Sequence, residues 1–193
     1  MIRIATEADL PAMLAIYAPY VLTTTYSFEY EVPTESAFLQ RFRSCTRQFP
    51  WLVWEENGEV LGYAYGSAPF ERAAYAWCAE SSIYLRPDAQ GRGIGGKLYR
   101  VLEQLLRKQG YQTLYAIVTQ ENTGSLQFHS RVGFAHLATF PRCGYKFGRW
   151  NGVVWMEKPL EIVESPGNSP MPWSVLVADV QNLEDILGTL SLS

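Results

Sequence analysis

The stretch Gln90–Gly96 constrains this chain most, because glycine fills four of its seven positions. The sequence before it predicts a strand over about Trp77–Leu85, and the sequence after it predicts a basic helix over about Gly96–Gln109. Without Cβ atoms, glycines let backbone N–H groups crowd around an anion, and the positive end of the following helix points at the same place. The stretch therefore predicts a binding site for a phosphorylated group.

Two nucleotide-binding motifs match this stretch in part. Gly91, Gly93 and Gly96 have the spacing of the dinucleotide fingerprint, with Glu121 as a candidate for the acid that binds a ribose. That fingerprint turns directly off a buried strand, whereas residues 87–90 intervene here. The residues after Gly96 also leave little room for a second half-domain, which disfavours a dehydrogenase.

The second motif, the phosphate-binding P-loop, matches from Gly91 to Lys97. Leu98 then stands where a Ser or Thr hydroxyl would bind magnesium. A nucleotide hydrolase is therefore disfavoured as well.

The composition predicts one packed domain. The length of 193 residues fits a single domain, and 48% apolar residues are enough for a full core. The formal net charge of −3 argues against nucleic acid as a partner. Positive charge nevertheless gathers around the glycine stretch, which fits either a phosphorylated cofactor or a solvated helix face. The basic residues there are Arg86, Arg92, Lys97, Arg100, Arg107 and Lys108.

Neither a membrane nor a metal is predicted as a partner. The N-terminus has no apolar signal core, and no stretch is long and apolar enough to span a membrane. Cys45, Cys78 and Cys143 are odd in number and lack the spacing of metal ligands. They indicate reduced thiols and a cytoplasmic protein.

The order of elements predicts an α+β fold with a mixed sheet, because antiparallel strands come first and a βαβ-type unit follows. Ile2–Ala5 is a short strand, and a capping box at Thr6–Asp9 starts the first helix. Asn57-Gly58 joins two apolar strands as a hairpin with a type I′ turn. The elements predicted after the glycine helix are a strand over Thr113–Thr119, a helix over about Thr123–Val132, a strand over Ala135–Phe140, a turn over Pro141–Lys146 and a strand over Trp150–Glu157.

The segment Ser165–Pro170 interrupts this pattern as a linker. We therefore expect a domain over residues 1–160 and a C-terminal extension over residues 161–193. Within the extension, Trp173–Ala178 fits a strand and Asn182–Leu190 a short amphipathic helix. Its apolar character predicts packing on this domain or on a partner subunit.

A series of motifs along the chain is similar to one known family. In order they are Ser27-Phe28-Glu29, Arg72-Ala-Ala-Tyr75, Glu80-Ser-Ser-Ile-Tyr84, Pro87–Gly95, Asn122-x-x-Ser125, Leu126-x-x-His129, Gly133-Phe134 and Gly144–Trp150. With them the chain resembles the GNAT N-acetyltransferases, and among these the phosphinothricin and methionine sulfone/sulfoximine acetyltransferase group. The resemblance covers about Ile2 to Pro159. Ala76 and Cys78 depart from the Arg and Val expected in that group.

The resemblance implies the GNAT acyl-CoA N-acyltransferase fold: a mixed, mostly antiparallel sheet that splays at its central strands and carries helices on both faces. It also implies acetyl-CoA as cofactor, direct transfer in a ternary complex to the α-amine of a small amino-acid-like substrate, and a homodimer. Pantetheine would pair with the backbone of Ile83, Tyr84 and Leu85, where an N–H would stabilise the oxyanion. The other residues that the resemblance assigns to the cofactor are Gln90, Gly91, Arg92, Gly93, Ile94, Gly95, Gly96, Lys97, Asn122 and Ser125.

Two titratable residues are candidates for the proton transfers that acetylation of an ammonium requires. Glu80 lies in an otherwise apolar strand, where desolvation raises a carboxyl pKa towards that of a general base, acting directly or through water. The alternative is a carboxylate at a sheet edge or one paired with Arg72. His129 takes the place where many GNAT enzymes have a tyrosine that protonates the departing sulfur; an imidazole can do this or relay the amine proton. The alternative is a structural histidine.

Arg72 and Lys146 are candidates to bind a carboxylate or phosphinyl-type anion of the substrate, with Phe28 and Tyr75 as aromatic walls. The alternative is that these are surface charges and core aromatics. Cys78 lies two residues before Glu80, but no histidine lies near it in sequence to support an acyl-cysteine route. A buried small residue is favoured there.

Two other functions stay open at this point. A protein N-terminal acetyltransferase needs an open peptide groove, whereas the bulky Phe28, Phe70 and Tyr75 favour a closed small pocket. A non-catalytic CoA-binding or interaction module would bind the cofactor without turnover. The presence of both Glu80 and His129 weighs against it.

Overall fold

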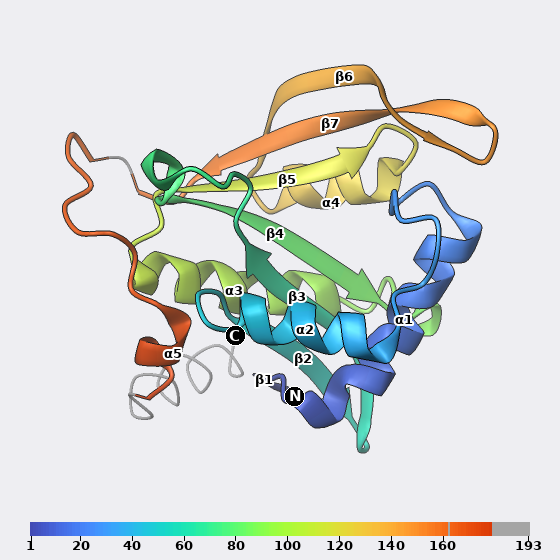
Figure 1. Ribbon diagram of the computed structural model, residues 1–193, viewed down its shortest axis with the longest axis horizontal. Coiled ribbons are helices and arrows are strands. Elements are labelled where there is room, and N and C mark those ends of the chain that lie inside the picture. The colour runs from blue at the N-terminus through green and yellow to red at the C-terminus, as the bar shows by residue number, and fades with distance from the viewer. Residues whose placement is uncertain (162, 179–193) are drawn as a thin grey trace.

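A seven-stranded sheet runs through the computed structural model, which describes residues 1–161 and 163–178 (Figure 1). Across the sheet the strands are β1 (Ile2–Ile4), β2 (Trp51–Glu56), β3 (Glu59–Ser67), β4 (Cys78–Leu85), β5 (Thr113–Thr119), β7 (Arg149–Pro159) and β6 (Ala135–Lys146). Among these strands β4 and β5 are parallel, and every other neighbouring pair is antiparallel. The predicted α+β class with a mixed, mostly antiparallel sheet is confirmed.

Helices cover both faces of this sheet (Figure 1). They are η1 (Glu7–Asp9), α1 (Leu10–Thr23), α2 (Glu35–Cys45), η2 (Ala73–Tyr75), η3 (Pro87–Ala89), α3 (Ile94–Gln109), α4 (Thr123–Arg131) and α5 (Trp173–Leu176). On one face, α3 buries Leu102 against strand residues such as Leu114, and α4 packs beside it. On the other face, α1 and α2 surround Trp51, whose ring contacts that of Phe38 edge-on. In the part of the chain that the structure describes, no helix is both long and apolar enough to cross a membrane.

The turn between β2 and β3 confirms the hairpin predicted from Asn57-Gly58. Asn57 has φ of 54° and Gly58 has φ of 80°, the two positive values that a type I′ turn requires. This hairpin supplies β3, the antiparallel neighbour of β4, and so supports β4 from one side.

The pairing between β4 and β5 stops halfway along the strands. Their parallel register runs from Cys78 to Glu80, which lies opposite Tyr115, and goes no further. Beyond this point β4 continues along β3, and β5 continues along β7. The expected splay of the central strands is confirmed, and Glu80 is the last residue of β4 before the gap opens.

The turn predicted over Pro141–Lys146 is wrong, because β6 continues along β7 through this range. The chain turns instead at Phe147 and Gly148, which both have positive φ. The register of β6 is irregular between Phe140 and Gly144. A bulge on an edge strand tolerates Pro141, which has no N–H to donate to a ladder. The turn-like composition therefore marks a bulge and not the end of a strand.

The strand predicted over Trp173–Ala178 is also wrong, since residues Trp173–Leu176 form α5. A helical turn places Trp173 and Leu176 on the same side, whereas a strand would place them on opposite faces. Both side chains are buried in the core that lies on the α3 side. The helix predicted over Asn182–Leu190 lies outside the described residues.

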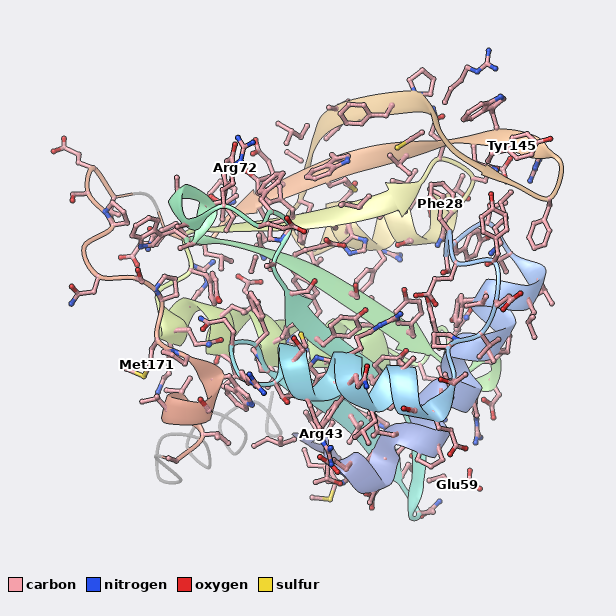
Figure 2. The ribbon with its side chains drawn as sticks, in the orientation of Figure 1. Phe28, Arg43, Glu59, Arg72, Tyr145 and Met171 are labelled. Carbon is pink, nitrogen blue, oxygen red and sulfur yellow. The ribbon has the colours of Figure 1, made fainter. Side chains whose placement is uncertain are left out.

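A buried glutamine fastens this extension to the domain. Gln109 Nε2 donates to the carbonyl oxygens of Met171 and Gln48, at 2.7 Å each. Figure 2 shows Met171 beside α5 at the edge of the molecule. The described part of the extension thus packs on its own domain.

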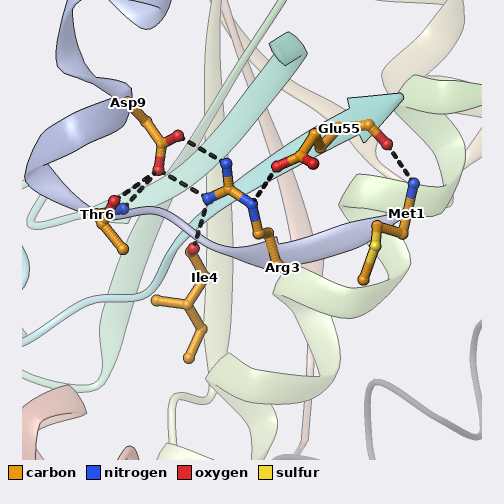
Figure 3. A network of polar contacts seen from close by, with 6 residues as sticks. All are labelled: Met1, Arg3, Ile4, Thr6, Asp9 and Glu55. Carbon is orange, nitrogen blue, oxygen red and sulfur yellow. Dashed lines mark hydrogen bonds and ion pairs between the residues drawn. The ribbon is translucent and has the colours of Figure 1, made fainter. Parts of the chain in front are cut away.

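Arg3 joins the first strand to the start of α1 and to β2 (Figure 3). Its guanidinium donates to both carboxylate oxygens of Asp9, at 2.7 and 2.8 Å, and to Glu55 at 2.6 Å. The Asp9 carboxylate also accepts the backbone N–H of Thr6 at 2.8 Å, as the predicted capping box requires. Its hydrogen bonds with Arg3 hold the pKa of Asp9 below the usual value. Through its bidentate pair with Asp9 and its ion pair with Glu55, Arg3 therefore connects three elements.

Replacing Arg3 with Gln is expected to lower the free energy of unfolding by about 2 kcal/mol near neutral pH, because it leaves a buried carboxylate without its bidentate partner. Urea denaturation measures this loss. Since the pKa of Asp9 is lowered on folding, its contribution is present above the unfolded pKa and is lost as pH falls through the folded pKa. The difference between wild type and variant should close in acid.

Arg43→Gln is the matched control, because Arg43 pairs with Glu7 in full solvent. Equal losses in the two variants would contradict the prediction.

Candidate active site

A gap and a cleft meet at the open end of β4. The gap between β4 and β5 holds a cavity of about 70 Å³, lined by both strands and by α4; we call it the sheet gap. A wider cavity of about 390 Å³ lies between the end of β4, the glycine stretch and the start of α4; we call it the loop cleft. Tyr20, Tyr26, Ile83, Asn122 and Ser125 line both. The two cavities are therefore parts of one site.

One edge of β4 faces the sheet gap with backbone groups that no strand pairs. The N–H of Arg86 donates to Leu61 O at 2.9 Å, so the backbone groups of Arg86 point to β3. Because this direction alternates along a strand, those of Tyr84 also point to β3, and those of Ile83 and Leu85 point into the gap. Of the three residues predicted to pair with pantetheine, Ile83 and Leu85 therefore direct their backbone groups into the gap, whereas Tyr84 does not.

Tyr20 closes the far end of this edge. Its hydroxyl donates to Leu85 O at 2.6 Å and lies 3.2 Å from Gln90 Nε2, which donates to it. A single hydroxyl thus connects the last turns of α1 with β4 and with the glycine stretch.

The glycine stretch forms the rim of the loop cleft. Gly91 and Gly93 have φ of 74° and 77°, which other residues rarely adopt. Gly93 caps α3, so the N–H groups of residues 94–96 precede any intrahelical carbonyl that could accept them. Gln90, Gly91 and Gly95 line the cleft. An anion there would meet backbone donors and the positive end of a 16-residue helix.

The charged side chains of the stretch face away from the cleft. Arg92 forms an ion pair with Glu56 at 2.6 Å, and Lys97 Nζ lies 5.5 Å from the centre of the Trp54 ring. In this conformation Arg92 therefore does not line the loop cleft. The cation that does line the loop cleft is Arg131 of α4.

Asn122 and Ser125 begin α4 on the opposite wall. Asn122 Oδ1 accepts the N–H of Ser125 at 3.1 Å and so caps the helix. Of the remaining residues predicted to bind cofactor, Ile94 is buried in the core. Gly96 lies in the first turn of α3, with open space where a Cβ would be.

Glu80 lies where the sheet gap opens, on the face opposite α3 and α4. Ala79 belongs to the core on the α3 side, and successive side chains of a strand point to opposite faces. Glu80 is half-buried and forms no ion pair or hydrogen bond with the described residues. The ion pair with Arg72 that was considered as an alternative is therefore not present. Burial raises the pKa of Glu80 to about 7. Such a carboxyl can take up and release a proton near neutral pH.

His129 is buried in α4 on the other side of the gap, which it lines. Its Nδ1 lies 2.8 Å from Ser125 O, a carbonyl that can only accept, so the ring hydrogen is assigned to Nδ1. Nε2 is then an acceptor, and it has no partner in the described part of the chain. Burial lowers the pKa of His129, so the ring is neutral at physiological pH. Relay of a proton fits this tautomer, whereas donation to sulfur from the resting ring does not.

The residues predicted to bind substrate do not all come together in one chain. Figure 2 shows Phe28 near the C-terminal end of β5 and Arg72 near its start, at opposite ends of the sheet. Tyr75 lies on the loop that carries Arg72, with its ring centre 4.6 Å from that of Phe70. One chain therefore supplies two separate groups.

Lys146 has a different role from the one predicted. Its side chain is 2% exposed, and Nζ donates to the carbonyl oxygens of Val21 and Ser27 at 2.7 Å each. These bonds fasten β6 to the last turn of α1 and to the loop after it. In that loop the Phe28 ring lies so close to Gly144 that a Cβ on Gly144 would overlap it. The Lys146 ammonium thus donates to backbone carbonyls in place of a substrate anion. Desolvation lowers the pKa of Lys146.

Sequence reasoning missed several residues of the two cavities, among them Tyr20, Tyr26, Phe128 and Arg131. No local motif marks Tyr20 and Tyr26, because only the packing of α1 brings them to the site. Arg131 did carry a local signal, since it is a basic residue two positions after His129 in the helix that contributes to the cleft.

Comparison with known proteins agrees with this geometry. A family model described as an acetyltransferase (GNAT) domain matches residues 2–155. A phosphinothricin N-acetyltransferase from Alcaligenes faecalis is 37% identical over 176 residues, which cover 89% of this chain and 86% of that protein. An L-methionine sulfoximine/L-methionine sulfone acetyltransferase from Pseudomonas aeruginosa is 39% identical over 169 residues, which cover 85% of this chain and 96% of that protein. The chain belongs to the GNAT acetyltransferase family.

A solved GNAT structure places the same fold around a cofactor. The phosphinothricin acetyltransferase from Sinorhizobium meliloti, in complex with acetyl-CoA, matches this chain with a TM-score of 0.81 at 34% identity, covering 89% of this chain and 92% of that one. The resemblance inferred from the motifs is thus confirmed, and this GNAT chain is an N-acetyltransferase.

Glu80→Gln is expected to stabilise the folded protein by about 2 to 3 kcal/mol at about pH 8 and to change little at about pH 4.5. A carboxyl whose pKa rises to about 7 on folding favours the folded state fully below its unfolded pKa, and this contribution is lost as pH rises through 7. Glutamine does not ionise, so the variant escapes the loss. Urea unfolding across this pH range measures the difference, and a variant less stable than wild type at the alkaline end would contradict the prediction.

Proposed function

We propose that this GNAT chain transfers the acetyl group of acetyl-CoA to the α-amine of a small amino-acid-like acceptor, of the phosphinothricin, methionine sulfone or methionine sulfoximine type. The names of its relatives support that acceptor class. The observation that carries the proposal is the position of Glu80, an unpaired carboxyl with a pKa of about 7 at the point where the β4–β5 pairing ends. It stands between the sheet gap and the open face of the sheet.

The residues of the two cavities fit acetyl-CoA. The backbone donors around Gly91 and Gly93 suit a pyrophosphate, and Arg131 suits a further phosphate oxygen. The edge of β4 suits the amide groups of an extended pantetheine arm, with Asn122 and Ser125 on the opposite wall. The buried, unpartnered Nε2 of His129 also suits a hydrogen-bond donor of a ligand in the gap. When bound, the cofactor supplies an acetyl group activated as a thioester.

The protein side chains handle protons and charge in this proposal. Glu80 accepts the proton that the acceptor's ammonium loses, directly or through water. An N–H of Ile83 or Leu85 would stabilise the oxyanion. The neutral His129 ring would accept the second proton of the amine at Nε2 and pass it to the departing thiolate. Burial raises the pKa of Cys78 above its usual value, which disfavours its thiolate as a nucleophile. Transfer is therefore direct, within a ternary complex.

The assembly is part of the same proposal: a cytoplasmic homodimer with a GNAT domain over residues 1–160 and an extension over 161–193. Exposed apolar side chains gather on the Glu80 face of β5, β7 and β6 and on the adjoining loop, around Trp155. They are Phe70, Tyr75, Ile117 and Phe140. Such a patch is typical of a protein interface. Within one chain Phe28 and Arg72 lie far apart (Figure 2). A second subunit bound to this patch would bring its own Phe28 towards Arg72 of the first subunit. The three cysteines are free thiols, as expected in the cytoplasm.

Activity is tested by following the release of free CoA thiol from acetyl-CoA. The acceptors are phosphinothricin, methionine sulfone, methionine sulfoximine, ordinary amino acids and a short peptide. We expect the analogues to react and Glu80→Gln to lower kcat by about 10²- to 10⁴-fold with unchanged acetyl-CoA affinity. Wild-type kcat/KM should rise as pH passes through about 7, where Glu80 ionises. The exposed Glu161 supplies the control variant, Glu161→Gln.

Each other outcome points elsewhere. Turnover of the peptide alone would indicate protein acetylation. Binding of acetyl-CoA without any turnover would indicate a binding module. A failure to bind acetyl-CoA would contradict the assignment of both cavities.

The dimer is tested by sedimentation velocity on wild type, Phe140→Arg and a control, Val175→Arg. Both replaced side chains are exposed, but Val175 lies on α5, on the α3 side of the sheet and away from the patch. We expect Phe140→Arg to raise the dimer dissociation constant by at least about tenfold, because it places a charge in an apolar interface, and Val175→Arg to leave it unchanged. A monomeric wild type would contradict the proposal.

A further inference from the structure

A third cavity, of about 530 Å³, opens between α2 and the end of β3. It shares no lining residue with the loop cleft or the sheet gap. The polar residues that line it are Arg41, Ser44, Gln48, Tyr65 and Ser67. We call it the α2 cavity.

The α2 cavity adjoins Glu80. Ser67 lies opposite Glu80 in the β3–β4 register, and Tyr65 lies opposite Ser82. Residues paired in this way point to the same face, with Cβ atoms about 4.5–5.5 Å apart. Ser67, in the wall of the cavity, is therefore a direct neighbour of Glu80, the proposed general base. Tyr65 is in the same way a neighbour of Ser82, the next residue on the Glu80 face of β4.

Arg41 is the charged side chain among the described residues that line this cavity. One guanidinium nitrogen donates to Glu29 Oε1, and the guanidinium carbon lies 5.9 Å from the centre of the Phe38 ring. An arginine carries five N–H donors, and the Glu29 contact is the single hydrogen bond of Arg41 within the described ranges. The other donors are available to a ligand in the cavity.

Glu29 holds Arg41 in place. Its backbone N–H donates to Ser27 Oγ at 3.2 Å, which fixes the turn that carries it. Its second carboxylate oxygen, Oε2, is buried and has no partner among the described residues. A buried carboxylate oxygen without a donor is costly, so the contact of Oε1 with Arg41 is what stabilises this carboxylate.

Among the described residues that line the cavity, the thiol is not available as a nucleophile. Cys45 lines it, but its thiol donates to Gly66 O at 2.9 Å. Burial raises the pKa of Cys45 to about 11, which keeps the thiol protonated. The cavity is suited to binding and not to a covalent step.

We propose that Arg41 binds the carboxylate of the acceptor in the α2 cavity, oriented by Glu29, so that the neighbouring α-amine is presented to Glu80. This inference rests on the proposed function and deepens it. It makes the acceptor a free α-amino acid, whose amine and carboxylate share one carbon. A peptide lacks the required anion, because the carboxyl of its first residue is an amide.

The test compares methionine sulfone with its carboxamide as acceptors, in wild type and in Arg41→Gln. The wild type is expected to prefer the free acid by about 30- to 200-fold in kcat/KM, the range of a charge-assisted hydrogen-bonded pair. Arg41→Gln should lower kcat/KM for the acid by a similar factor, mainly through KM, and for the amide by less than about threefold. Glu29→Gln should weaken the preference in part, because Arg41 loses its orientation.

Arg43→Gln is the matched control, because it removes an Arg–Glu pair from the same helix. Arg43 pairs with Glu7 just before α1, and neither residue lines the α2 cavity. Figure 2 shows Arg43 below α2. This variant should change kcat/KM for the acid and for the amide by no more than about twofold. Unchanged acetyl-CoA affinity and thermal stability show that Arg41→Gln is folded.

Equal losses for acid and amide in Arg41→Gln, or an acid preference that survives it, would overturn the inference. If the wild type acetylates neither acceptor, the proposed function fails. Equilibrium titration of the acid and the amide in the presence of CoA then tests the anion site without turnover. Preferential binding of the acid that disappears in Arg41→Gln supports an anion site in the α2 cavity. Equal binding of acid and amide to the wild type overturns the inference.

Discussion

The end of the β4–β5 ladder at Glu80 is the constraint on which the rest of the site depends. Three register pairs hold the two strands together, and β3 and β7 hold them in place beyond that point. The strands can therefore separate without unfolding, although backbone groups buried without a partner are costly. The same interruption leaves the inward-facing backbone groups of Ile83 and Leu85 without a strand partner, and it places Glu80 between the sheet gap and the open face of the sheet.

Two carboxyls show how differently the chain uses burial. Asp9 is paired by Arg3, and its pKa falls below the usual value. Glu80 is left unpaired, and desolvation raises its pKa to about 7. The first arrangement favours the folded state at neutral pH and the second disfavours it. A destabilising carboxyl in the middle of a sheet is understandable where it must exchange a proton during a reaction.

Sequence alone predicted the features that short stretches encode. The hairpin at Asn57-Gly58, the helix after the glycine stretch and the mixed sheet all follow from local chemistry. It failed where packing between distant segments decides. The charge of Lys146 does not reveal that it is buried against two carbonyls, and nothing near Arg41 marks it as the wall of a cavity beside β4. Trp173 was assigned to a strand because its apolar neighbours fit either period over so short a segment.

The Tyr20 hydroxyl on Leu85 O has a consequence for how the protein avoids aggregation. An unpaired strand edge is a template on which another polypeptide can add as an extra strand. Here the edge lies inside the fold, walled by β5 and α4, and its outer carbonyl is already occupied by Tyr20. The sheet gap holds about 70 Å³, which leaves no room for a second β-strand with its side chains. The fold thus keeps an unpaired strand edge out of reach of other polypeptides.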